Sequence, residues 1–151
     1  MQDLIVKSSV AGVVSFLYKQ VVNHLLYYLG ITPFLYRVEA ASLVLPMSQV
    51  HTYYGIFIGL FADIVVMLWF SLLIGLVLRA TGRDYSLLKG AFVGASSWVI
   101  VYGLFTHVGY LPLYSPTGFA SGLTTIFFDI TMGIVASVVY IYLTRKESLT
   151  D

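Results

Sequence analysis

The sequence predicts an all-α, polytopic membrane protein built as a bundle of four transmembrane helices. Of its 151 residues, 59% are hydrophobic and 10% are charged, and the mean hydropathy is +0.90. Soluble domains carry roughly 25% charged residues. The run 55–78 contains a single charge, Asp63, and as a helix it is about 36 Å long, enough to cross a hydrocarbon core of about 30 Å. Three further apolar runs have similar lengths.

The four spans form a single transmembrane domain, residues 1–151. We place them at about 8–30, 55–78, 90–111 and 119–144. The external connection, 31–54, contains an apolar piece too short to span, which we interpret as interfacial or re-entrant. Residues 79–89 form a short basic loop. We do not expect the first span to be a cleavable signal peptide, because Lys19 and His24 fall where a small-residue cleavage site is required.

Basic residues mark one side of the membrane. Six lie at span ends that face the same side: Lys7, Arg79, Arg83, Lys89, Arg145 and Lys146. In the connections on the other side there is only Arg37. Because cytoplasmic loops carry the excess of Lys and Arg, we expect both termini and the 79–89 loop in the cytoplasm, and the protein in the cell (inner) membrane. Tyrosines cluster at the outer ends as an aromatic belt: Tyr27, Tyr28, Tyr53, Tyr54 and Tyr110.

The two halves of the chain resemble each other. Lys7 and Lys89 are each followed by a glycine after five residues and a serine after eight, and Asp63 and Asp129 each precede an arginine by sixteen residues. Shared glycines and aromatics are common to all transmembrane helices, which is one explanation. The matching spacing from aspartate to arginine favours a duplicated two-helix unit. Both units have the same orientation, which predicts two parallel repeats about an axis along the membrane normal.

Small residues at four-residue spacing mark the helix faces that pack. Asp63 follows Gly55 and Gly59 on one such stripe. A second stripe comprises Thr125, Asp129, Gly133 and Ser137. Small residues let helices approach closely in lipid, so both aspartates are predicted to face the bundle interior.

The glycine faces also support an alternative function without chemistry of its own. Gly55 with Gly59, and Gly90 with Gly94, suggest contact surface beyond a single bundle. The alternative is therefore a structural or accessory membrane subunit that packs against itself, as a homodimer, or against a partner protein.

Ionisable residues inside the spans are the candidate functional site. Counted from the inner helix ends, four of them lie at about 24–27 Å: His24, Asp63, His107 and Asp129. Lys19 lies about one helical turn below, at roughly 18 Å, within reach of an aspartate. Intramembrane charges are costly and find partners, so one aspartate is expected to pair with Lys19 and the other to stay able to take up a proton. The layer predicts proton or cation handling. Buried pairs that only fix helix register, with both histidines at the wet interface, are the other interpretation.

Other chemistries are excluded or disfavoured. A net charge of +1 without clustered basic residues excludes a nucleic-acid surface, and the absence of cysteine excludes thiolate ligands. No hydrolase, zinc-protease, P-loop or dinucleotide motif is present, so we expect no enzyme. Two His and two Asp are ligand types for a divalent metal, although no two share the i, i+4 spacing. The sequence requires no cofactor, and haem with two axial histidines is disfavoured because bulky side chains crowd His24.

Part of the sequence resembles a known family. Residues 11–19, AGVVSFLYK, are similar to the first helix of the YagU-type bacterial inner-membrane proteins. Residues 87–94, LLKGAFVG, and the Pro-containing turn after the third span are similar too. The resemblance implies a four-helix plan for most of the chain and an association with acid tolerance. The chain departs from that family at Asp63 and Asp129, where the family carries histidines.

Overall fold

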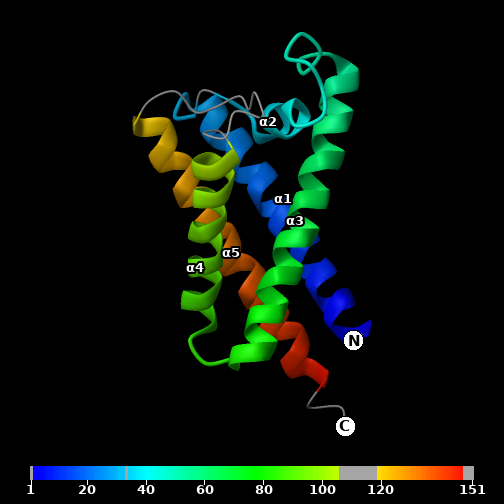
Figure 1. Cartoon of the computed structure of the whole chain (residues 1–151), viewed down its shortest axis with the longest axis vertical. Coiled ribbons are helices and arrows are strands. Elements are labelled where there is room, and N and C mark those ends of the chain that lie inside the picture. Colours follow the sequence, from blue (N-terminus) through cyan, green and yellow to red (C-terminus); the bar gives the residue numbers. More distant parts are fainter. Residues whose placement is uncertain (1, 33, 106–118, 148–151) are drawn as a thin grey trace.

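The computed structural model describes residues 2–32, 34–105 and 119–147, and within these ranges every regular element is a helix (Figure 1). The elements in chain order are α1 (Gln2–Tyr28), α2 (Tyr36–Ser42), α3 (Tyr53–Thr81), α4 (Ser86–Trp98), the π-helix η1 (Val99–Phe105) and α5 (Phe119–Glu147). The long helices run along the molecule, and α2 lies across one end, which we call the α2 end. The predicted all-α class is therefore confirmed.

Three of the described helices are long and apolar enough to cross a membrane. Their candidate spans are Asp3–Tyr28, Tyr53–Thr81 and Gly122–Arg145. They are compatible with a membrane location. α4 continues without a break into η1, so residues 86–105 form one helical segment. The predicted third span, 90–111, runs on into residues 106–118, which lie outside the described part of the chain.

The helices extend beyond the predicted spans at the end opposite α2. α3 continues to Thr81 and α4 begins at Ser86, so most of the predicted 79–89 loop is helical. Gly82 ends α3 with φ +84°, a conformation that favours glycine. The Lys89 ammonium donates to the carbonyl oxygens of Thr81 and Gly82, at 3.0 and 2.9 Å. These bonds satisfy carbonyls at the end of α3 and tie the start of α4 to that end.

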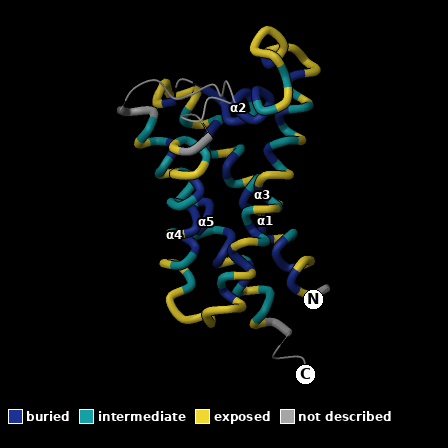
Figure 2. Tube along the Cα trace, in the orientation of Figure 1, coloured by how far each residue is buried: buried dark blue, intermediate teal, exposed yellow. Residues whose placement is uncertain are grey.

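The long helices bury several polar and small residues and expose many apolar ones. On α1, Ser15 and Asn23 are buried, whereas Val13 and Leu17 are exposed. The predicted stripe of α3 is confirmed, since Gly55, Gly59, Asp63, Met67, Ser71 and Gly75 are all buried. Figure 2 shows the buried positions where the helices meet and exposed positions along their outer faces. This distribution suits a lipid environment, in which polar groups must find partners inside the protein.

Close backbone contacts at glycines set how the helices cross. α1 packs on α3 and α5, and α4 packs mainly on α5. A methyl group added at Gly12 would lie 3.1 Å from the Leu68 Cα atom, while one at Gly94 would meet the carbonyl oxygen of Asp129. In the predicted repeat, Gly12 corresponds to Gly94 and Asp63 corresponds to Asp129. Gly94 meets α5 at Asp129 itself, whereas Gly12 meets α3 about one helical turn beyond Asp63. The way the helices pack therefore does not follow the predicted repeat.

The glycine faces predicted as surplus contact surface are occupied within the chain. A methyl group at Gly55 would meet the carbonyl of Gln49, and one at Gly59 would meet the carbonyl of Arg37. Gly90 and its α4 neighbour Gly94 face the backbone of α5. The expectation that these faces are free for a partner is wrong, because the connection 31–54 (the outer connection) and α5 fill them. The homodimer stays a prediction without this support.

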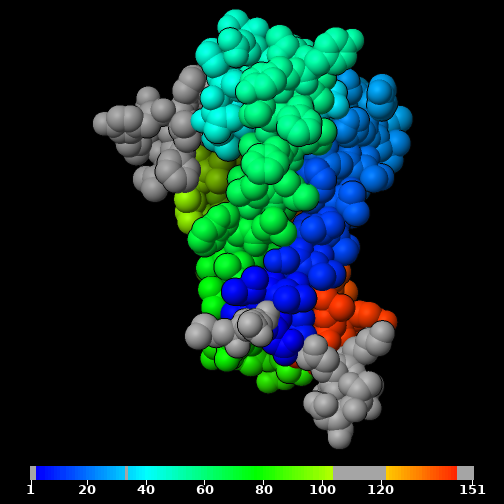
Figure 3. Space-filling model, turned by 90° about the vertical axis from the view of Figure 1, so that its right-hand side faces the viewer, coloured from blue at the N-terminus to red at the C-terminus, as the bar shows by residue number. Residues whose placement is uncertain are grey.

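The described ends of α1 and α5 lie together at the end opposite α2 (Figures 1 and 3). On the face in Figure 3, α3 runs the length of the molecule beside α1. The connection 82–85 lies at the same end as both termini. The basic residues predicted to face the cytoplasm belong to this end.

Candidate functional site

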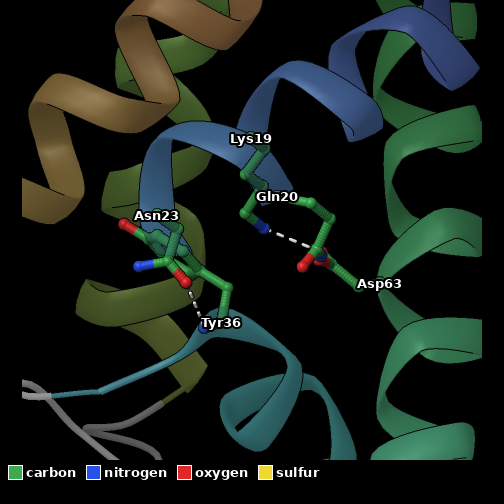
Figure 4. Close-up of polar contacts among 5 residues, drawn as sticks. All are labelled: Lys19, Gln20, Asn23, Tyr36 and Asp63. Atoms are coloured by element: carbon green, nitrogen blue, oxygen red, sulfur yellow. Dashed lines mark hydrogen bonds and ion pairs between the residues drawn. The ribbon is translucent and has the colours of Figure 1, made fainter. Parts of the chain in front are cut away.

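The centre of the site is a buried ion pair between α1 and α3. The Lys19 Nζ atom lies 2.7 Å from Oδ1 of Asp63, and Gln20 donates to Oδ2 of the same carboxylate at 2.6 Å (Figure 4). The side chains of Lys19 and Asp63 are only 8% and 2% exposed. Successive residues of α1 thus satisfy both oxygens of one carboxylate. Lys19 was predicted to pair with one of the two aspartates, and in the structure that aspartate is Asp63.

α2 closes the site at one end of the molecule. The buried Asn23 side chain accepts from the Tyr36 backbone N–H at 2.9 Å and donates to the Phe34 carbonyl at 3.3 Å, as Figure 4 shows for Tyr36. Gly59 lets the backbone of α2 approach α3 closely. These contacts hold the start of α2 above Lys19, whose ammonium lies 4.3 Å from the centre of the Tyr36 ring. At that distance, ring and cation attract each other.

A cavity of about 300 Å³ adjoins the ion pair. Charged or polar residues of several elements line it: Lys19, Asp63, Asp129, Glu39, Tyr36, Tyr102 and Ser97. The second aspartate of the predicted layer, Asp129, thus comes to the same space as the pair, carried by α5 and set in place by the close approach of Gly94. Among the described residues, no hydrogen bond or ion pair reaches its side chain.

Glu39 is a member of the site that the sequence did not reveal. It is 6% exposed, and its Oε2 atom has no hydrogen-bond partner within the described ranges. Burial raises the pKa of Glu39 to about 7. A hydrogen bond from Tyr102 and the charge of Lys19 act in the opposite direction, whereas Asp129 and Asp63 add to the rise.

The sequence did contain a signal for Glu39, an acid within the apolar run of the outer connection. Its neighbour Arg37 offered an apparent partner. Residues two apart on a helix do not face each other, and Arg37 lines a separate pocket of about 180 Å³ with His51. The basic residue nearest to Glu39 in the sequence, Arg37, therefore lies at another site, and Glu39 shares its cavity with Lys19.

The histidines of the predicted layer do not join the cluster in the described part of the chain. His24 is half-buried, its Nδ1 atom lies 2.8 Å from the Gln20 carbonyl oxygen, and it does not line the cavity. His107 lies outside the described residues. Within those residues, no three His, Asp or Glu side chains converge as metal ligands.

The described structure defines a class: an all-helical chain with long apolar helices compatible with a membrane location, and with a carboxylate-rich cavity inside. Comparison with protein families, curated proteins and solved structures yields no match. The resemblance to the YagU-type proteins stays a prediction.

Proposed function

We propose that this chain is a non-enzymatic, four-span protein of the cell membrane that handles protons or a cation through its buried charge cluster. The observation that carries the proposal is that Asp129 and Glu39 share a cavity with the Lys19–Asp63 ion pair. Neither forms an ion pair within the described ranges. Three carboxylates thus face one ammonium, and a mobile cation or proton would balance the excess.

The uneven pairing of the two aspartates gives the cluster its chemistry. Asp63 has a cation at 2.7 Å and an amide donor at 2.6 Å, which stabilise its charged form. Asp129 is half-buried and has neither, and a charge removed from water without a partner is costly. Asp129 is thus the group that gains or loses a proton, while the ion pair fixes the positions of α1 and α3.

A fourth crossing by residues 86–105 is part of the proposal. The outward positions of this segment are apolar and exposed: Leu87, Leu88, Phe92, Val99 and Ile100. Such a face is expected of a helix in contact with lipid. The Lys and Arg residues gathered at the end opposite α2 favour a cytoplasmic location for that end.

Proton flux into liposomes tests the proposal. The purified chain is reconstituted with a pH-sensitive dye inside, and a pH gradient is imposed at clamped membrane potential. Wild-type protein is expected to carry a flux that Asp129→Asn abolishes while the protein stays folded in detergent. Asp84→Asn removes an exposed carboxylate of the 82–85 connection, so it is the matched control and is expected to keep the flux.

Two results would contradict the proposal. One is a wild-type protein that passes neither protons nor alkali cations. The other is a flux that Asp129→Asn leaves unchanged. A loss of stability in Asp63→Asn with no flux in any variant would assign the ion pair to helix register alone.

A further inference from the structure

The cavity is larger than proton transfer requires. A volume of about 300 Å³ is at the lower end of the range for small-molecule sites. Its charged groups come from four of the surrounding helices: Lys19 from α1, Glu39 from α2, Asp63 from α3 and Asp129 from α5. Apolar side chains provide much of the remaining wall: Leu43, Val66, Met67, Phe70, Val101 and Met132. A molecule that matches this lining is compact, largely apolar and carries a charge.

Two buried polar atoms at the cavity lack partners in the described chain. They are the Tyr36 hydroxyl and the Oε2 atom of Glu39, in residues 4% and 6% exposed. A buried polar group without a hydrogen bond is costly, so these atoms are expected to bind something that enters the cavity. The Tyr36 hydroxyl can donate or accept a hydrogen bond, whereas the Glu39 oxygen accepts one or faces a positive charge.

The excess of carboxylates determines the sign of the charge that a ligand must carry. Lys19 is held by Asp63 at 2.7 Å, which leaves Asp129 and Glu39 as the lining carboxylates without an ion-pair partner among the described residues. A cation is therefore attracted and an anion repelled. A bare divalent ion needs several converging oxygen ligands, and no group of three such side chains converges in the described part. An organic cation needs only charge and apolar contact.

The cavity reaches the surface of the molecule beside α3 and η1. Lining residues that keep some exposure include Val66 and Phe70 of α3 and Val101 and Tyr102 of η1. α3 and α4 diverge above the 82–85 connection (Figure 1), with few contacts between them. The opening is thus framed by apolar side chains on helices that face lipid.

We propose that this cavity binds a lipophilic organic monocation, an amine or quaternary ammonium that enters between α3 and η1, with Asp129 and Glu39 as its counter-charges. The inference deepens the proposed function and rests on it. The apolar body of the ligand displaces water from Val66, Met67 and Phe70, while its charge is balanced by the carboxylates. Aromatic rings at the site, such as Tyr102, add cation–π attraction.

Calorimetric titration with benzyltrimethylammonium tests the inference. The full chain is purified in detergent at pH 8 and titrated with this cation and with its neutral carbon isostere, neopentylbenzene, and both are also titrated into protein-free micelles. The cation is expected to bind and the isostere to bind at least about tenfold more weakly. Asp129→Asn and Glu39→Gln are each expected to weaken cation binding by at least about tenfold, because a counter-charge that lines the cavity is lost. Asp84→Asn is expected to bind as wild type.

Lower pH is expected to weaken binding, because protons then compete for the carboxylates. The inference is overturned if the cation does not bind, if cation and isostere bind equally, or if both cavity variants bind as wild type. Absent binding together with an Asp129-dependent proton flux would remove the ligand and leave the proposed function standing. Binding without flux would support the ligand and contradict proton handling.

Discussion

At the scale of single residues, the site depends on which carboxylate receives the only lysine of the cavity lining. Lys19 reaches Asp63 rather than Asp129, and Gln20 completes the coordination of the same carboxylate. Asp129 and Glu39 are left beside a cavity with no ion pair in the described chain. In the proposed function, the ion pair fixes the helices and the two acids without an ion-pair partner handle the proton or cation.

Lys19→Met is expected to lower the free energy of unfolding by about 3–5 kcal/mol, because Asp63 would remain as a buried charge without its cation. Adding Asp63→Asn to that variant should restore most of the loss, since a neutral amide needs no counter-charge. Denaturation in detergent of both single variants and the double variant measures the coupling. A Lys19→Met protein as stable as wild type would contradict the ion pair.

Glu39 makes stability depend on pH. Its pKa is about 7 in the folded protein against 4.5 for the free side chain, so the folded state holds its proton more tightly. This contribution is fully present below pH 4.5 and is lost as the pH rises through 7. It amounts to roughly 3 kcal/mol. Glu39→Gln is expected to remove this pH dependence and to raise stability at pH 8.

Thermal unfolding of wild type and Glu39→Gln in detergent, between pH 5 and pH 8, checks this expectation. The informative quantity is the difference between the two proteins at each pH, because other groups titrate equally in both. A difference that does not grow with pH would show that Glu39 is not buried in its neutral form.

At the scale of elements, backbone approach at glycines positions the site. Gly59 brings α2 onto α3 and so places Glu39 and Tyr36 over the cavity. Gly94 brings α4 onto the backbone of α5 at Asp129. α4 then runs into η1, and π-helical turns often occur at functional sites. This segment supplies Tyr102, which donates to Glu39.

Gly94→Ala is expected to destabilise the protein by about 1–3 kcal/mol, because the new methyl group would meet the Asp129 carbonyl oxygen. Gly122→Ala is the matched control, since a methyl group there would have nothing within 4 Å. That control should be neutral or more stable by up to about 1 kcal/mol, as alanine favours a helix. Equal melting temperatures for the two variants would contradict the close α4–α5 contact.

At the scale of the whole molecule, the two ends are built from different segments of the described chain. α2 and the outer connection gather at one end, and the described termini gather with the 82–85 connection at the other. Because the chain has no cysteine, single cysteines can report the side of the membrane on which each end lies.

Ser48→Cys is expected to react with an impermeant maleimide in intact cells, because Ser48 is exposed at the α2 end. Asp84→Cys and Asp151→Cys are expected to react only after the membrane is opened. Four crossings put residues 84 and 151 on the same side, whereas three crossings put them on opposite sides. Labelling of intact cells at residue 151 but not at residue 84 would therefore remove α4–η1 as a span.

Much of the fold was predictable because a transmembrane helix forms its backbone hydrogen bonds within itself and is recognisable in the sequence as a continuous apolar run. The all-α class, the long apolar helices and the small-residue stripe of α3 followed from the sequence alone. Three of the five predicted site residues, Lys19, Asp63 and Asp129, line one cavity. His24 has a comparable depth but points to the Gln20 carbonyl instead, because depth along a helix leaves the direction of a side chain open.

The sequence by itself determined which segments are helical and apolar, and which charges are costly enough to need partners. Only the tertiary structure decided which residues those partners are. Glu39 and Tyr36 reach the cluster because α2 folds back over α1 and α3, and the free faces expected at Gly55 and Gly90 disappear into contacts with the outer connection and α5. The physical reason is range: hydrophobic periodicity is encoded within one helix, whereas an ion pair or a close backbone approach joins residues tens of positions apart, as between Lys19 and Asp63.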